Sequence, residues 1–342
     1  MGLSHKSWVG SSPKLRLYSG LELNPPSAII RSRAPVLQRE ASAAVTRNVW
    51  DLEIYQNNLY ASLNANQFAV PGSGLTRVNL GSFSETGVVF FNADEFNVMG
   101  IAVDPARGYI YACCYNPTAP PSKVVRVDID TFTRVDAITL GALPGDFFSA
   151  DVLIIEPYLY VVCDEVPTQL YRIDLNTWSI VDSIIFALIA EDDGQFLHEG
   201  NDGNIYISTM GLFAPGAILK ASINPFARVG SISLVGVEND GATCPMEVVG
   251  TKLYVGLYRG WGQPGGVARV DLPTFTRDAT VVFPAGVSYP GGLVAYGDYL
   301  YVVTQGVPAK LVRINLTTFT YETAISFNAG ENNGRGMVAL FR

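Results

Sequence analysis

The chain has 342 residues, of which 48% are hydrophobic and 11% aromatic, and its formal net charge at pH 7 is -8. This apolar content excludes a disordered chain. The 23 Lys and Arg residues are spread along the sequence, which argues against nucleic acid or an anionic membrane surface as a partner. The 33 glycines and 20 prolines favour many short strands joined by turns.

The N-terminal region is interpreted as three short strands, at 7–12 (SWVGSS), 13–23 (PKLRLYSGLEL) and 27–32 (SAIIRS). It lacks the long apolar stretch of a secretory signal. No segment of the chain approaches the roughly 18 apolar residues that a membrane-spanning helix needs. We therefore expect a chain that does not insert into a membrane and is either cytoplasmic or assembled into a particle.

Six copies of one repeat follow, across residues 45–327. Each contains an apolar residue, a Tyr and a β-rich run, as in GYIYACC and PYLYVVC. A second strand motif follows, such as VVRVDIDTF, and an alternating strand such as RVDAITL closes the unit. Four short strands in a repeated unit of roughly 45–50 residues predict a β-propeller. The six repeat tyrosines are Tyr60, Tyr111, Tyr160, Tyr206, Tyr254 and Tyr301.

The C-terminal segment GMVALF predicts one more first strand with nothing after it. The three N-terminal strands supply what this segment lacks, so we predict a seventh blade made of 1–33 and 336–342. The predicted fold is all-β: a single seven-bladed propeller domain over 1–342, with four-stranded antiparallel blades and a ring closed by the two chain ends. Such closure removes open sheet edges. Six blades with an N-terminal arm is the alternative.

The pattern LYVV…LVRINLTTFT…ISF in the last repeat resembles the YVTN-type propeller repeats of bacterial and viral proteins. The resemblance covers nearly the whole chain and implies the propeller fold. Proteins of this kind include surface-layer and recognition proteins, and lactonase-like enzymes share the architecture. Because one fold carries many functions, the resemblance leaves the function open.

Two sets of residues recur once per repeat and are interpreted as architecture rather than as a site. The basic residue of the third strand is expected to pair with the acid two positions along, as Arg126 with Asp128. The aromatic residue of the last turn is expected to form a packing plug between outer strands. The basic set is Arg77, Arg126, Arg172, Lys220, Arg269 and Arg313, and the aromatic set is Phe83, Phe132, Trp178, Phe226, Phe275 and Phe319.

The chain has only two histidines, His5 and His198, which excludes a catalytic triad and a multi-histidine metal site. His198 and Glu199 could form an acid–base pair facing a central channel. A structural histidine is favoured, because no nucleophile motif such as GxSxG accompanies it. No catalytic residue is assigned, and a chain without enzymatic activity is favoured.

The loops that enter the first strand of each blade are acidic, and in a propeller they surround the mouth of the channel. Carboxylates that converge there would suit Ca²⁺, the one cofactor these residues suggest. A solvated acidic rim is the simpler interpretation, because the spacing matches no calcium-binding loop. The candidate metal residues are Glu191, Asp192, Asp193, Glu238, Asp240 and Glu331.

The loops between the second and third strands are long and unlike one another, and variable loops on a constant scaffold favour recognition. The predicted binding residues in these loops are Phe68, Tyr115, Phe213, Tyr258, Arg259 and Trp261. We predict a non-catalytic recognition scaffold for a protein, peptide or glycan. One alternative is a structural component of a larger assembly, such as a virion or surface layer. The other is a lactonase-like hydrolase with a divalent cation in the funnel.

Overall fold

Every regular element in the described part of the chain is a β-strand. The structure is a computed structural model of the chain. It describes residues 17–20, 22–23, 47–48, 50–65, 72–115, 121–141, 149–164, 166–186, 191–210, 215–234, 245–259, 263–328 and 335–339. These residues contain no helix, and therefore none long and apolar enough to cross a membrane.

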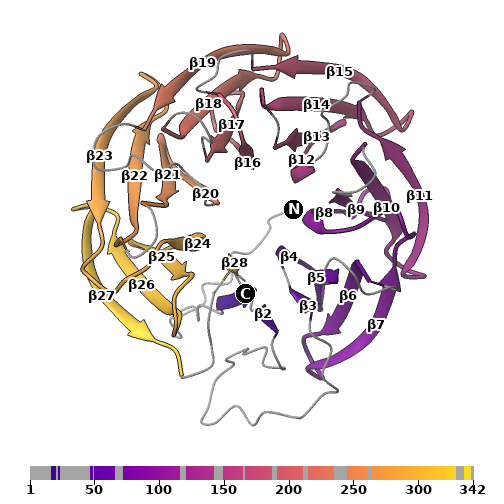
Figure 1. Cartoon of the computed structure of the whole chain (residues 1–342), viewed down its shortest axis with the longest axis horizontal. Coiled ribbons are helices and arrows are strands. Elements are labelled where there is room, and N and C mark those ends of the chain that lie inside the picture. Colours follow the sequence, from indigo (N-terminus) through magenta and orange to yellow (C-terminus); the bar gives the residue numbers. More distant parts are fainter. Residues whose placement is uncertain are drawn as a thin grey trace, which may run out of the picture.

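Six antiparallel four-stranded blades follow one another along the chain around a central opening (Figure 1). Blades one to three consist of β4 (Leu52–Tyr55), β5 (Asn58–Ala65), β6 (Gly74–Asn79) and β7 (Ser84–Phe90); β8 (Val98–Asp104), β9 (Tyr109–Cys114), β10 (Lys123–Asp128) and β11 (Thr133–Thr139); and β12 (Ser149–Ile155), β13 (Tyr158–Cys163), β14 (Gln169–Asp174) and β15 (Ser179–Ile185). Blades four to six consist of β16 (Gly194–Glu199), β17 (Asn204–Thr209), β18 (Ala217–Ser222) and β19 (Ala227–Ser233); β20 (Met246–Val249), β21 (Lys252–Leu257), β22 (Gly266–Asp271) and β23 (Thr276–Val282); and β24 (Pro290–Tyr296), β25 (Tyr299–Thr304), β26 (Lys310–Asn315) and β27 (Thr320–Ser326).

The position of a strand within its blade follows from its sequence pattern. The first strand of each blade lines the opening and the fourth forms the outer rim (Figure 1). The second strand packs against neighbouring blades on both faces, so β13, with the sequence YLYVVC, has buried residues at five of its six positions. The outer strand β15 has only one buried residue. The run of apolar and aromatic residues after each repeat tyrosine is therefore the core of the propeller.

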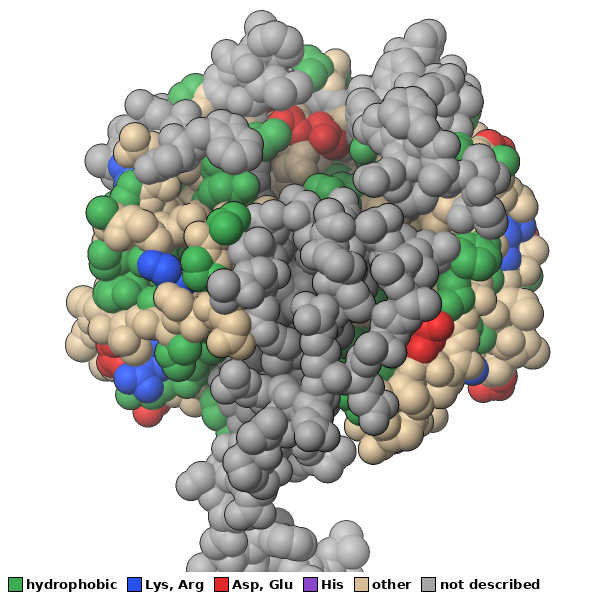
Figure 2. Space-filling model, turned by 60° about the horizontal axis from the view of Figure 1, so that its bottom comes forward, with side chains coloured by type: hydrophobic (Ala, Val, Ile, Leu, Met, Phe, Trp, Pro, Cys, Tyr) green, Lys and Arg blue, Asp and Glu red, His purple; other side chains and the backbone are tan. Residues whose placement is uncertain are grey.

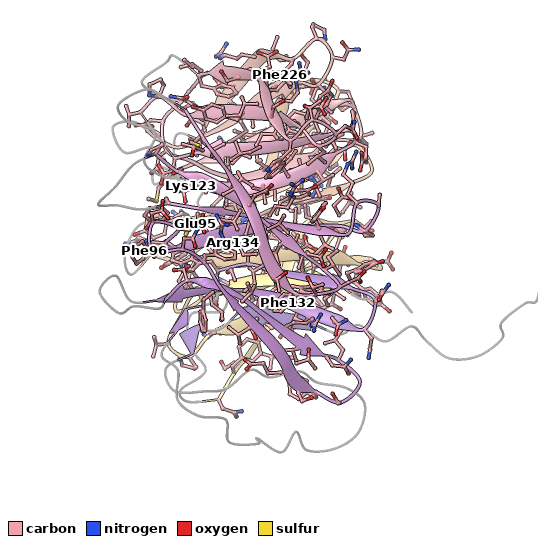
Figure 3. All side chains as sticks on the ribbon, turned by 90° about the vertical axis from the view of Figure 1, so that its right-hand side faces the viewer. Glu95, Phe96, Lys123, Phe132, Arg134 and Phe226 are labelled. Carbon is pink, nitrogen blue, oxygen red and sulfur yellow. The ribbon has the colours of Figure 1, made fainter. Side chains whose placement is uncertain are left out.

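An aromatic pair joins each blade to the one before it. In blades two to six, the aromatic residue of the last turn packs on the repeat tyrosine of the preceding blade, with ring centroids 5.3–6.0 Å apart. Phe132 on Tyr60 is one such pair, and Figure 3 labels Phe132 and its counterpart Phe226. The recurring aromatic residue is therefore architectural, as predicted, but it packs on the second strand of the preceding blade rather than between outer strands. Phe83 of blade one stacks on no tyrosine of the described residues and is 42% exposed.

We expect Phe132→Leu to lower the free energy of unfolding by about 1 kcal/mol, because it leaves a gap over Tyr60. Phe83→Leu should change the free energy of unfolding by less than about 0.5 kcal/mol, as is usual for exposed positions. Urea unfolding of the two variants beside the parent chain measures both values. Equal losses would mean that Phe83 also packs against a partner.

The predicted seventh four-stranded blade is wrong. Among the described residues, β1 (Leu17–Gly20) pairs antiparallel with β28 (Arg335–Ala339) as a sheet of two strands. The short strands β2 (Glu22–Leu23) and β3 (Arg47–Asn48) extend the sheet of blade one beside the end of β5. The expected strands at 7–12 and 27–32 lie outside the described residues. The physical reason is that the segment expected to be one strand, 13–23, joins two different sheets, since β1 pairs with β28 whereas β2 pairs with β3 beside blade one.

The basic residues of the third strands are architectural, but their predicted partners are wrong. Arg126 Nε donates to Asp136 Oδ1 at 3.0 Å, and Asp136 lies on the adjacent outer strand. The guanidinium also lies 4.7 Å from the centre of the Trp178 ring. Asp128, the expected partner, instead accepts a hydrogen bond from Thr131 N in the following turn. The acid two residues along therefore shapes the turn, and a neighbouring strand supplies the counter-charge.

Candidate functional site

One repeat position at the end of the second strand differs in chemistry from blade to blade. In blades two to six the second strand ends beside the start of the inner strand, as Cys163 beside Ser149, whereas in blade one β5 continues beside β3, where Asn64 pairs with Asn48. This position therefore borders one end of the central opening. It lies four residues after the repeat tyrosine, and we call the six side chains there the mouth ring: Asn64, Tyr115, Asp164, Met210, Tyr258 and Gln305.

Side chains of the mouth ring contact the start of the next blade. Asp164 Oδ2 accepts a hydrogen bond from Gln195 Nε2 at 2.8 Å. The Tyr258 ring stands edge-on to Tyr289, with centroids 4.7 Å apart. Burial, and then the Asp164 carboxylate, raise the pKa of Tyr115, so its hydroxyl remains a donor at neutral pH. The ring thus combines aromatic faces with hydrogen-bond donors and acceptors.

Asn64 is the member of the mouth ring whose side-chain amide lacks the hydrogen bonds that a buried polar group needs from the described residues. Its side chain is 4% exposed, and among the described residues neither the amide nitrogen nor the amide oxygen has a hydrogen-bond partner. A buried polar group without partners costs about 1–3 kcal/mol. Almost all such groups in proteins are satisfied by protein atoms or by bound water. The Asn64 amide is therefore arranged to bind a water molecule or a ligand that both donates and accepts.

Three of the six predicted binding residues are described. Tyr115, Tyr258 and Arg259 are half-buried, and Arg259 Nη1 donates to the carbonyl oxygen of Pro264 at 3.4 Å. The other three, Phe68, Phe213 and Trp261, lie outside the described residues. A search for large loop side chains missed Asn64 and Gln305, which are smaller and polar. Comparing the residue four positions after the repeat tyrosine in all six copies identifies both.

Glu191, a candidate metal ligand, is neutralised by a basic side chain. It is fully buried, and its Oε2 accepts a hydrogen bond from Arg228 Nε at 2.9 Å. Blade two has the same arrangement, in which Arg134 Nε donates to the buried Glu95 at 2.8 Å (Figure 3). Each pair ties the loop that enters a blade to the outer strand of that blade. The Glu191 carboxylate therefore has a structural role, as the partner of Arg228.

The other described candidates for a metal site are also buried. Asp192 and Asp193 are at most 1% exposed, and Asp193 Oδ1 accepts a hydrogen bond from Gln195 Nε2. Within the described ranges, no three His, Cys, Asp or Glu side chains are grouped so that they could hold a metal ion. The remaining candidates, Glu238, Asp240 and Glu331, lie outside these ranges. The Ca²⁺ site therefore stays a prediction.

A second group of carboxylates links the inner strands, and sequence reasoning missed it. Figure 2 shows Asp and Glu side chains, in red, within a hollow in the upper part of that view. The edge of each inner strand presents backbone N–H groups that no further strand can pair. In blades one, three and five, an acid accepts such a bond from the next blade: Asp51 Oδ2 from Ile101 N (2.8 Å), Asp151 Oδ2 from Leu197 N (2.8 Å) and Glu247 Oε1 from Ala295 N (3.2 Å).

Glycine makes room for one of these acids. A Cβ atom on Gly100 of β8 would lie 2.6 Å from Asp151 Oδ1, so the close approach of blades two and three requires a residue without a side chain there. The sequence signal for the group is an acid inside an otherwise apolar first strand, as in VWDLEIY and SADVLII.

We call Asp51, Glu53, Asp151 and Glu247 the channel acids, and the pKa of Glu53 is raised further than that of Asp51. Burial raises the pKa of Asp51 to about 6, although hydrogen bonds from Ile101 N and Leu52 N act against this. Burial, followed by the carboxylates of Asp51 and Asp151, raises the pKa of Glu53 to about 8. Of the two carboxyl groups, Glu53 therefore keeps its proton to higher pH than Asp51 does. A base and an acid in one site are what proton transfer requires.

His198 has a structural contact rather than the expected acid–base partner. Its Nδ1 lies 2.7 Å from the backbone carbonyl oxygen of Glu199, to which the Nδ1–H donates. Burial lowers the pKa of His198, which favours the neutral ring. The hydrogen bond is made to the backbone of Glu199, and the exposed Glu199 carboxylate takes no part in it.

The repeat, the antiparallel four-stranded blades and their arrangement around a central opening define an all-β propeller. Solved structures show the same fold. The Pseudomonas aeruginosa periplasmic gluconolactonase PpgL matches with a TM-score of 0.70 and 11% identity, over 95% of this chain and 99% of that chain. A putative 6-phosphogluconolactonase from Bacteroides uniformis matches with a TM-score of 0.70 and 14% identity, also over 95% and 99%.

Hydrazine synthase of Kuenenia stuttgartiensis matches with a TM-score of 0.61 and 16% identity, over 78% of this chain and 76% of that chain. No protein-family model matches the chain, and no curated protein matches it. Identities this low show the fold alone, and the named neighbours differ in activity. The function must therefore be argued from the side chains.

Proposed function

We propose that this chain is a recognition propeller whose mouth ring binds a neutral, hydroxyl-rich ligand, with a glycan as the ligand class. The observation that carries the proposal is the Asn64 amide, which is buried and whose nitrogen and oxygen both have no partner in the part of the chain that the structure describes. A sugar hydroxyl both donates and accepts, so one or two hydroxyls could satisfy the whole amide.

The rest of the mouth ring suits the same ligand class. Asp164 and Gln305 can accept hydroxyl protons, and the rings of Tyr115 and Tyr258 offer apolar faces to the C–H surface of a sugar. Ligand sites commonly combine apolar and aromatic walls with a few placed polar groups. The formal charge of -8 disfavours an anionic ligand.

A ring of contacts from six blades requires a rigid frame, and we include ring closure in the proposal. β28 contacts β24 of blade six and β4 of blade one, and it pairs with β1 from the other end of the chain. The two-stranded sheet of β1 and β28 would then hold blades one and six together across the sector between them.

A glycan array followed by calorimetry on any hit tests the binding proposal. We expect Asn64→Ala to weaken binding at least tenfold, which is about 1.4 kcal/mol. Its fold should persist, because removal of an unsatisfied amide is neutral or stabilising. Asn57→Ala, in an exposed turn between β4 and β5 at the other end of the blade, is the matched control. If no glycan binds, or if both variants bind equally well, the proposal is wrong.

A second candidate function, lactone hydrolysis, rests on the channel acids. PpgL is a gluconolactonase by its title, and Glu53 and Asp51 supply an acid and a base near neutral pH. In such a reaction, Asp51 would take a proton from a water molecule as the oxygen of that water attacks the lactone carbonyl carbon. Glu53 would give its proton to the ring oxygen as the C–O bond breaks, leaving a hydroxy acid.

An assay of glucono-1,5-lactone hydrolysis, in which the rate is measured from proton release, tests this second candidate. Glu53→Gln should lower the rate at least a hundredfold, since general acid catalysis contributes about 10²–10⁴. Asn64→Ala, at the mouth, should lower it less. A rate equal to that of buffer alone would exclude this substrate class for the chain.

A further inference from the structure

The junction of blades three and four contains two buried side-chain oxygen atoms that lack partners. Asp193, in the loop that enters blade four, is 1% exposed, and Thr168, directly before β14 of blade three, is fully buried. Among the described residues, neither Asp193 Oδ2 nor Thr168 Oγ1 has a hydrogen-bond partner. Because almost all buried polar atoms of proteins are satisfied, such a pair of atoms indicates a bound group.

Contacts at Gly194 bring these two residues to one place. Gly194 follows Asp193 and begins β16, and a Cβ atom on it would lie 3.2 Å from Thr168 Oγ1. The Thr168 side chain therefore lies against the backbone of the segment that carries Asp193. The carbonyl oxygen of Asp193 accepts a hydrogen bond from Met210 N at 2.9 Å, and Met210 belongs to the mouth ring. Asp193 and Thr168 thus lie beside the mouth ring.

The residue at the position of Thr168 has a partner in blades one and two. Ser73 and Ser122 stand directly before the third strands of these blades, as Thr168 does in blade three. Ser73 Oγ accepts from Asn97 N and Ser122 Oγ accepts from Ser149 N, both at 3.0 Å, where the chain enters the next blade. The Thr168 hydroxyl has no such bond to a described residue. The junction of blades three and four therefore differs from its two neighbours.

The Asp193 carboxylate has no basic partner to offset its charge. The Gln195 side chain is shared, since its Nε2 donates to Asp164 Oδ2 at 2.8 Å and also to Asp193 Oδ1. Arg228, the base that pairs in this loop, is bound to Glu191 at 2.9 Å, and among the described residues no base pairs with Asp193. A buried charge is costly unless it is paired. A ligand for this junction should therefore donate hydrogen bonds and carry a positive charge.

We propose that the junction of blades three and four binds an ammonium group, either the free ion or the end of a primary amine. Its N–H groups would donate to Asp193 Oδ2 and Thr168 Oγ1, and its charge would offset the carboxylate. A metal ion suits the junction less well, because the described part of the chain groups no three His, Cys, Asp or Glu side chains that could hold one. Asp164 and Gln195 are only half-buried, so the ligand enters from the mouth of the opening.

This ammonium site is separate from the Asn64 amide that carries the proposed glycan site. Asn64 belongs to β5 of blade one, whereas Asp193 precedes β16 of blade four, on another side of the opening (Figure 1). The Asn64 amide both donates and accepts, whereas a carboxylate oxygen only accepts. The two proposals can therefore fail independently.

The melting temperature of the whole chain, measured at neutral pH in about 100 mM of one chloride salt at a time, tests the site. Ammonium or methylammonium chloride should raise it by about 2 °C relative to tetramethylammonium chloride, whose cation has no N–H group. A rise with ammonium alone would assign the site to the free ion, and a rise with both salts would extend it to primary amines. Potassium chloride should give no rise.

Asp193→Asn should abolish the rise in melting temperature, because it removes the charge but keeps an acceptor for Gln195. The variant should fold, since blade two has Asn97 at the same position, also with a positive φ. Asp130→Asn, which removes the same charge from an exposed turn on the outer rim, is the matched control and should keep the full rise. Thr168→Val, which removes only the hydroxyl, should lower the rise to half or less.

Circular dichroism establishes that each variant is folded. A melting temperature that neither ammonium nor methylammonium raises overturns the proposal. An equal rise with potassium chloride would indicate a metal cation and would also overturn it, as would an undiminished rise in Asp193→Asn. Asn64→Ala should keep the full rise, so a loss of glycan binding in that variant is distinguishable from a loss of the ammonium site.

Discussion

Replacing Arg228 with alanine should lower the free energy of unfolding by about 3 kcal/mol, the lower end of the cost of breaking a buried ion pair, because Glu191 is buried whereas Arg228 is 35% exposed. The Glu191 carboxylate is fully buried, and Arg228 supplies its counter-charge, with Nε 2.9 Å from Oε2. Without the guanidinium, the carboxylate remains in the interior as an uncompensated charge, which is far more costly than loss of an exposed pair. The melting temperature should fall by roughly 5–10 °C in a chain of this length. Urea unfolding and thermal unfolding at pH 7 measure the two quantities.

Arg313→Ala is the matched control for this prediction. Its partner Glu322 lies on the outer rim, and the two side chains are 41% and 28% exposed. A pair of this kind contributes about 1 kcal/mol or less. Equal losses from the two variants would mean that Glu191 is hydrated. In that case Glu191 would again be available for the Ca²⁺ that the acidic loops suggest.

The strands of the six blades could be predicted because each repeat buries the same residues for the same reason. PYLYVVC predicts a strand buried on both faces, and β13 covers Tyr158–Cys163 within it. The seventh blade could not be predicted in this way. Residues 13–23 alternate like a strand, but in the structure 17–20 pair directly with the C-terminal strand. Local alternation indicates a strand without fixing its partner or the number of strands beside it.

The candidate site was harder to predict because its chemistry depends on contacts between distant residues. The acidic run at 191–193 suggests a cation site, but Arg228 follows Glu191 after 37 residues and occupies its carboxylate. Nothing in the sequence around Asn64 marks it as unusual. Its importance arises from burial and from the lack of a partner, which are properties of the folded chain. Asp51 and Glu53 were visible as acids in an apolar strand, but their raised pKa values require the neighbouring blades.

The channel acids lead to a pH dependence of stability opposite to that of exposed ion pairs. Burial raises the pKa of Glu53 from its ordinary value of 4.5 to about 8, that of Glu247 from 4.5 to about 7, and that of Asp51 from 3.8 to about 6. Well below pH 3.8, the ordinary pKa of an aspartate, these groups are protonated in both the folded and the unfolded chain. As the pH rises, the unfolded chain releases its protons first, so the free energy of unfolding falls until the folded chain ionises too. His198, with a lowered pKa, opposes this trend with a single group.

We therefore expect the wild-type free energy of unfolding to fall between about pH 5 and pH 8.5, and Glu53→Gln to remove a large part of the fall. One pKa unit corresponds to about 1.4 kcal/mol, so the variant should be more stable than the parent by on the order of 4 kcal/mol at the upper pH and nearly equal to it at the lower. Asp51→Asn should instead destabilise at both pH values, because an amide group that replaces one carboxylate oxygen cannot accept from both Ile101 N and Leu52 N. Urea unfolding at the two pH values separates these effects. If the Glu53→Gln curve runs parallel to that of the parent, Glu53 is ionised at neutral pH in the folded chain, and its role as the acid in lactone hydrolysis is lost with it.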